Sequence, residues 1–187
     1  MGENTLVITE KPLHFLLRYS DKITRVDTIA EHQHIEKQYG EVWMGKFGVG
    51  IAKKIAKRAL NNIKLNQSCK IFLMNGCTYT HIANVIDIYV DLEHGLVSKP
   101  ADLNLIPEYY RKKSCTVWFK LSSIKPFHND YLTDIRLYND PGSQPSKSGM
   151  RGLIYLTDTS FDHSPKKRRK NKLSDTHLSL LSGGLFD

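Results

Sequence analysis

The sequence of 187 residues has little cysteine and no long hydrophobic run. Its three cysteines, Cys69, Cys77 and Cys115, form no C-x-x-C pair and lie within or beside apolar segments. We therefore expect reduced, mostly buried thiols rather than a disulfide framework or a metal site. No apolar stretch approaches the roughly 18–20 residues of a membrane span, and the N-terminus has no signal-peptide pattern. These absences predict a cytoplasmic protein without a membrane anchor.

Sequence motifs of the common catalytic sites are also missing. The chain has eight histidines but no H-E-x-x-H motif, no nucleophile elbow, no Walker loop and no zinc-deaminase signature. In "EHQH" (31–34), His32 and His34 are two residues apart, so on a helix their side chains point about 200° apart and cannot share an ion. We therefore expect no catalysis, no metal and no cofactor.

The composition that remains is that of a basic globular protein. Hydrophobic residues make up 40% and charged residues 25% of the chain, which predicts a domain over residues 1–160. A tail over 161–187 carries the basic run "SPKKRRKNK" and the apolar end "HLSLLSGGLFD", and we expect it to be largely disordered. The net charge is +8, of which +4 falls within 164–187, and such a balance favours phosphate-bearing partners.

Hydrophobic periodicity predicts several short strands and one tight turn. Asn75-Gly76 is a strong turn dipeptide, and 93–114 has the composition of a loop with a short helix at "IPEYYRK". Short strands with two early helices favour an α+β domain with a curled or closed sheet. The expected strands span 12–20, 41–47, 69–76, 79–92, 115–127, 134–140 and 151–158.

Two helices are predicted between the first strands. The first spans 27–40, with Asp27 or Thr28 as its N-cap and Gly40 as its end. The second spans 51–63 and has two contrasting faces. One face is apolar and the other basic: Ile51, Ile55, Ala59 and Leu60 against Lys53, Lys54, Lys57 and Arg58.

Aromatic and basic residues are interleaved at two places. Trp43 lies between Gly40 and Gly45, close to Lys46 and Phe47. A second cluster in the long loop consists of Tyr109, Tyr110, Arg111, Lys112 and Lys113. Aromatic faces stack on an extruded base and cations hold its backbone, so these clusters suit nucleic acid. The alternative is that Trp43 and Trp118 belong to the core and the lysines only solvate a helix.

The order of these segments resembles the YTH domain and its EVE-like relatives in the PUA superfamily. The similarity covers roughly residues 12 to 127 and includes a tryptophan strand after the first helix. The segments that carry it are "LHFLLRYS", "IAEHQHIEKQYGEVWMGK", "AKKIAKRALNN", "CKIFLMNGCTYTHIANVIDIY" and "CTVWFKLSSIKPF".

This resemblance implies a PUA-like mixed β-barrel with packed helices that reads a modified, commonly methylated base in DNA or RNA without catalysis. Trp43 is then one wall of an open aromatic cage, Tyr109 or Tyr110 the other, and backbone around Met44 meets the base edge. The polar contacts are expected at Gln33, His34 and Asn75. The phosphate contacts are expected at Lys46, Lys53, Lys54, Lys57, Lys112 and Lys113.

The resemblance also implies a setting, bacterial defence or restriction, in which a reader without a nuclease motif needs a partner effector such as a nuclease or an ATPase. Two other classes stay open at this point. One is an enzyme that acts on modified nucleosides, and the other is an adaptor that docks on a partner through its apolar tail.

Overall fold

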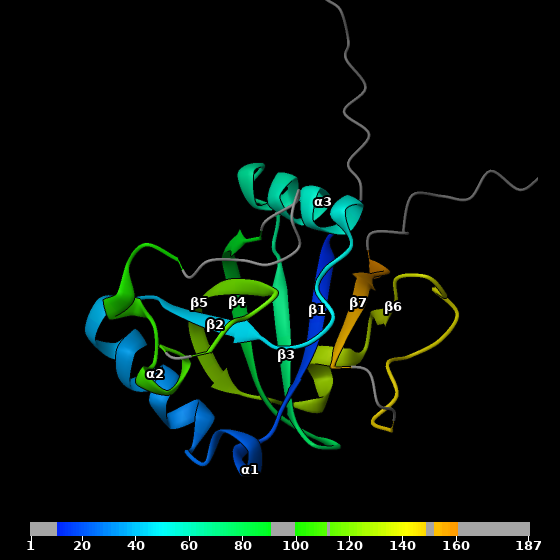
Figure 1. Ribbon diagram of the computed structural model, residues 1–187. Coiled ribbons are helices and arrows are strands. Elements are labelled where there is room, and N and C mark those ends of the chain that lie inside the picture. The colour runs from blue at the N-terminus through cyan, green and yellow to red at the C-terminus, as the bar shows by residue number, and fades with distance from the viewer. Residues whose placement is uncertain (1–10, 91–99, 112, 149–151, 161–187) are drawn as a thin grey trace, which may run out of the picture.

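The computed structural model describes residues 11–90, 100–111, 113–148 and 152–160. Seven strands form one mixed sheet in the order β2-β5-β4-β3-β1-β7-β6 (Figure 1). Only β1 and β3 run parallel, and the other neighbours are antiparallel. The strands are β1 (Leu13–Tyr19), β2 (Val42–Lys46), β3 (Lys70–Asn75), β4 (Thr78–Tyr89), β5 (Val117–Pro126), β6 (Ile135–Leu137) and β7 (Leu153–Asp158).

The sheet curls like a barrel but is not closed by hydrogen bonds. Its edge strands are β2 and β6, and β2 pairs with β5 alone. Alternating side chains of the curled strands meet in its interior, where the rings of Phe15 and Phe119 lie 5.0 Å apart. The predicted α+β architecture with a barrel-like sheet is therefore confirmed, and the closed form of that barrel is not observed.

Local capping explains where the first long helix begins and ends. In α2 (Thr28–Tyr39), the Asp27 carboxylate accepts a hydrogen bond from the Ala30 N–H at 3.0 Å. Gly40 follows with φ of 81°, a conformation that suits glycine, and its N–H donates to the Glu36 carbonyl. Both predicted cap positions are confirmed.

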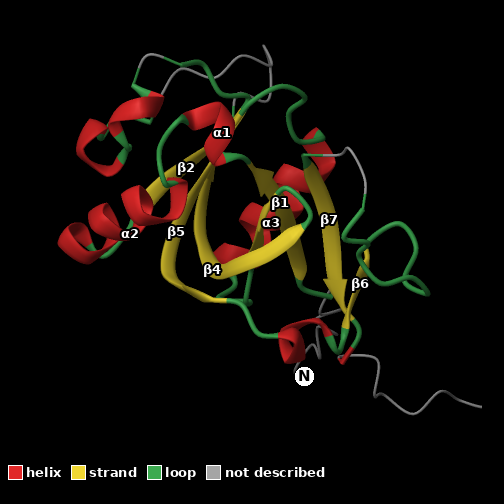
Figure 2. Cartoon of the chain, turned by 90° about the horizontal axis from the view of Figure 1, so that it is seen from below, coloured by secondary structure: helices red, strands yellow, loops and turns green. Residues whose placement is uncertain are grey.

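The second long helix, α3 (Lys53–Lys64), buries Ile55 and Ala59 against the sheet and leaves Lys53, Lys54 and Lys57 exposed. Arg58 was predicted on the exposed basic face, but its guanidinium donates to the Lys11 carbonyl and to the Tyr138 hydroxyl. Figures 1 and 2 together show α3 across one end of the curled sheet. No helix within the described ranges is long and apolar enough to cross a membrane.

Short helical turns complete the domain. The one-turn helix α1 (Asp21–Thr24) directly follows β1 and was not predicted. Figure 2 shows α1 and α2 beside β2, with β6 and β7 on the other side of the molecule. Three 3-10 turns lie in connections: η1 (Leu103–Leu105), η2 (Glu108–Tyr110) and η3 (Asn129–Leu132).

The predicted turn and thiols agree with the structure. Gly76 has φ of 60° in the turn between β3 and β4. Cys69 and Cys115 are buried and Cys77 is exposed, all three as free thiols. The predicted tail lies outside the described residues, so the boundary at residue 160 stays a prediction.

Candidate functional site

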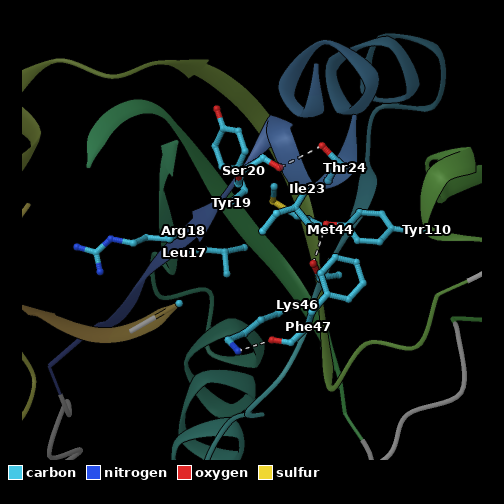
Figure 3. A pocket seen from close by; sticks show the side chains of 12 residues that line it. Leu17, Arg18, Tyr19, Ser20, Ile23, Thr24, Met44, Lys46, Phe47 and Tyr110 are labelled. Carbon is cyan, nitrogen blue, oxygen red and sulfur yellow. Dashed lines mark hydrogen bonds between the residues drawn. The ribbon is translucent and has the colours of Figure 1, made fainter. Parts of the chain in front are cut away.

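A pocket of about 280 Å³ lies where the unpaired edge of β2 faces the end of β1 (Figure 3). The register of β7 explains the opening. The first residue of β7, Leu153, pairs with Leu17 of β1. One further hydrogen bond follows, in which the Arg18 N–H donates to the Gly152 carbonyl at 2.9 Å. Within the described residues no strand pairs with β1 on this side beyond that bond, and the pocket is bordered there by α1, β2 and η2.

The walls of the pocket are mainly apolar. Leu17 and Met44 form its floor, and Ile23 from α1 stands above them with 71% of its surface exposed. Phe47, just after β2, is 37% exposed at the rim. Arg18 belongs to the lining, but its guanidinium points away from the other side chains and donates to the Ser146 and Lys147 carbonyls.

Tyr110 of η2 fixes the loop against β2. It is only 2% exposed, and its hydroxyl donates to the Gly45 carbonyl at 2.7 Å. Its ring lies 5.4 Å from that of Phe47, 5.3 Å from that of Trp118 and 5.9 Å from that of His32. Burial raises the pKa of Tyr110 well above its usual value, so the phenol remains a neutral donor.

Gly45 is needed at this place because of close packing behind β2. A Cβ atom on Gly45 would lie 2.4 Å from the Cys115 sulfur and 2.9 Å from the Trp118 ring. Any side chain there would force β2 to move away from Cys115 and Trp118.

Lys46 lies in the pocket wall and not, as predicted, on a surface open to phosphates. It is 8% exposed, and its Nζ donates to the Phe47 carbonyl at 2.8 Å and to the Val49 carbonyl. Burial lowers the pKa of Lys46. Two carbonyl acceptors compensate the buried ammonium, which explains how a lysine is tolerated in an apolar wall.

The expectation that Trp43 lines an open pocket is wrong. Side chains alternate along β2, so Met44 faces the pocket and Trp43 faces the opposite side. There Trp43 is 5% exposed and packs with Leu105, Ile106 and Trp118, as the alternative reading of a core tryptophan predicts. Contact with the long loop is confirmed, but Lys120, with Nζ 5.1 Å from the ring centre, covers the indole.

The three residues predicted to make polar contacts with the base lie outside the pocket. Gln33 donates to the Ile124 carbonyl at 3.2 Å and borders a separate open hollow between α2 and β5. His34 is exposed on α2, and the amide of Asn75 donates to Asp21 Oδ2 at 2.7 Å. None of the three lines the pocket, because α2 turns Gln33 toward β5 and the Asn75 amide is engaged with α1.

The remaining predicted residues surround the pocket or lie apart from it. Tyr109 packs on Tyr110 with ring centres 4.3 Å apart, behind the pocket wall. Lys113 places its Nζ 5.4 Å from the centre of the Phe47 ring, at the rim. Lys112 lies outside the described residues. Of the predicted set, the pocket brings together Met44, Lys46 and Tyr110.

Sequence reasoning missed most of the lining on the β1 side. These residues gather only because β1 runs past the start of β7 and α1 folds back over its end. A weak signal was available in "LRYSDKIT", where a strand pattern leads directly into a polar turn. The missed lining residues are Leu17, Arg18, Tyr19, Ser20, Ile23, Thr24, Gly45, Phe47 and Gly152.

Comparison with known proteins places most of the sheet in one family. No curated protein matches the sequence. Among solved structures, the chain is similar to the YTH domain of the Zygosaccharomyces rouxii MRB1 protein in complex with N6-methyladenosine RNA, at 12% identity over 76% of each chain and a TM-score of 0.37. The Pua-like family matches residues 15–153, a span that runs from β1 to the first residue of β7. This chain is a member of the Pua-like family.

Proposed function

We propose that this protein is a non-catalytic nucleic-acid reader that accepts one extruded, modified base in the pocket between β1 and β2. The observation that carries the proposal is the pocket itself: an apolar space of about 280 Å³ with aromatic side chains at one wall and its rim. Small-molecule pockets begin at roughly 300 Å³, so this space suits a group the size of a single base.

The lining matches the chemistry of a base. The exposed side chain of Ile23 offers apolar contact for a methyl substituent, and the ring of Phe47, 37% exposed at the rim, offers a surface for a flat heterocycle. Leu17, Met44 and Tyr110 are buried and back these two side chains. Stacking of a base on an aromatic side chain contributes about 1–3 kcal/mol to binding. In this arrangement Trp43 does not touch the base and instead supports β2 from behind.

Cations at the rim of the pocket and on α3 are suited to the nucleic-acid strand that carries the base. Lys113 lies at the rim over Phe47, and Lys53, Lys54 and Lys57 are exposed on α3. Contacts between lysines and phosphates add affinity that does not depend on sequence. A reader of this kind acts through an effector protein such as a nuclease or an ATPase, and bacterial defence is a setting that fits it.

Binding of matched oligonucleotides tests the proposal. The full chain is titrated with DNA and RNA strands that carry a plain, a methylated, a hydroxymethylated or a missing base at one central position. We expect at least one modified strand to bind about tenfold more tightly than the abasic strand, and more tightly than the matching plain strand. Equal binding of the plain and modified strands would contradict the proposal, and release of an altered nucleoside would favour an enzyme instead.

Two glycine variants then assign the binding to the pocket. Gly152 borders the pocket, and a Cβ atom there would meet only the Lys46 side chain, at 3.8 Å or more. The Gly152→Leu variant should therefore fold but fill the space and abolish preference for the modified base. Gly142→Leu is the matched control, because Gly142 lies in a turn outside the pocket lining.

A further inference from the structure

Lys46 has a donor that the fold does not use. An ammonium carries three N–H groups, and within the described residues Nζ gives two of them to the Phe47 and Val49 carbonyls. No carboxylate in the described part of the chain forms an ion pair with it. Figure 3 shows this side chain beside Phe47, with the nitrogen at the Phe47 carbonyl.

Lys46 and Gly152 both border the pocket. A Cβ atom on Gly152 would lie 3.9 Å from the Lys46 Nζ. Because Gly152 has no side chain, no protein atom fills this position, and a ligand oxygen that approaches Nζ to about 2.9 Å can accept the third N–H. The Tyr110 hydroxyl, another donor in the lining, is already engaged by the Gly45 carbonyl.

We propose that the Lys46 ammonium donates its third hydrogen bond to an exocyclic keto oxygen of the bound base, and so selects keto bases over their amino counterparts. This inference rests on the proposed function, since it names the class of base that the same pocket takes. A phosphate is disfavoured in this position, because the rest of the lining is mainly apolar and offers little to replace its water.

The selection follows from the chemistry of the ammonium group. It has donors and no acceptor, so an exocyclic amino group in the same place would set donor against donor. Burial lowers the pKa of Lys46, but the two carbonyls that accept from Nζ favour the protonated form. A hydrogen bond from a charged group to a buried acceptor discriminates by at least about tenfold.

The test compares pairs of strands that differ by one keto or amino group. One pair carries 5-methyluracil or 5-methylcytosine at the central position, and the other carries guanine or 2,6-diaminopurine. An abasic strand of the same sequence measures binding that does not involve a base. The full chain is compared with Lys46→Met, which removes the donor, and with Lys64→Met, which removes an exposed lysine that does not line the pocket.

We expect the wild type and Lys64→Met to prefer the keto member of at least one pair by about tenfold or more, and Lys46→Met to reduce this preference below about twofold. If Lys46→Met does not fold, Gly152→Ala places a methyl group beside Nζ and should reduce the same preference, with Gly142→Ala as its control.

Three results would overturn the inference. They are equal binding within both pairs, a preference for the amino members, and a keto preference that survives both Lys46→Met and Gly152→Ala. If every strand binds no better than the abasic one, the proposed function fails as well. If strands with a base bind better than the abasic one but show no keto preference, only the inference about Lys46 fails.

Discussion

The two faces of β2 have different surroundings, although the same five residues form both of them. On one face Met44 and Lys46 border an open pocket, and Phe47 lies exposed at its rim. On the other face Trp43 packs with Leu105, Ile106 and Trp118, with Lys120 over its ring. The comparison teaches that the large aromatic residue is the support and that smaller, less conspicuous side chains form the surface available to a ligand.

Replacing Trp43, which supports β2 from behind, should have the largest effect on stability. Trp43→Ala deletes a buried indole from the cluster with Leu105, Ile106 and Trp118, and we expect the free energy of unfolding to fall by about 3–5 kcal/mol. Denaturant unfolding followed by circular dichroism measures this loss. A variant that is as stable as the wild type would show that Trp43 is not part of the core.

Low pH should lower the free energy of unfolding, because His32 is buried beside the cluster that contains Trp43. Burial lowers the pKa of His32, which contacts Tyr109 and Tyr110, from 6.5 to about 4. The unfolded chain therefore binds a proton that the folded chain excludes, and stability falls as the pH drops from about 6.5 toward 4. The difference of about 2.5 pKa units corresponds to a loss of about 3 kcal/mol from this group.

Unfolding curves at pH 7 and pH 4.5 for the wild type and for His32→Phe measure this dependence. The variant has no group to protonate at this site, so its stability should fall less between the two values. His14 also has its pKa lowered to about 4 by burial and remains in both proteins, which makes the comparison specific to His32. Equal pH dependence of both proteins would contradict the assignment.

On the open face, a change should affect binding rather than folding. Phe47→Ala removes an exposed ring at the rim, and we expect it to weaken binding of the preferred strand by about 1–3 kcal/mol. The free energy of unfolding should change by less than about 1 kcal/mol. Fluorescence anisotropy with a labelled strand gives the first quantity and denaturant unfolding the second, and the opposite pattern would reverse the roles of the two faces.

The smallest effect is expected from the lysines of α3. Replacing Lys53, Lys54 and Lys57 with glutamine should weaken modified and plain strands alike, because phosphate contacts carry no sequence information. The slope of log affinity against log salt should decrease by up to about 2 for single strands. A loss confined to the modified strand would place these lysines at the base instead.

Local signals explain why much of the fold was predictable from the sequence. Asp27 and Gly40 mark the ends of α2 through hydrogen bonds within a few residues. Asn75-Gly76 marks the turn between β3 and β4, because Gly76 adopts the left-handed backbone conformation. The orientation of β2 had no such signal. All five of its residues are buried, so alternation between polar and apolar residues did not show which face carries the pocket.

The pocket itself depends on relations between distant segments. It exists because β7 begins opposite Leu17, and because Tyr110 reaches across 65 residues of chain to the Gly45 carbonyl. The buried position of Lys46 likewise depends on the turn that brings the Val49 carbonyl back to it. No short stretch of sequence encodes these arrangements.

The most direct test of the central claim observes the pocket while a strand binds. Met44 lies in the pocket and Met74 lies in a separate cluster, so their methyl groups report on two places in one protein. Methyl resonances are followed by NMR during titration with the preferred modified strand. A base that enters between β1 and β2 should shift the Met44 methyl upfield through its ring current and leave Met74 unchanged. If Met44 does not move while the strand binds, the base lies elsewhere and the account is wrong.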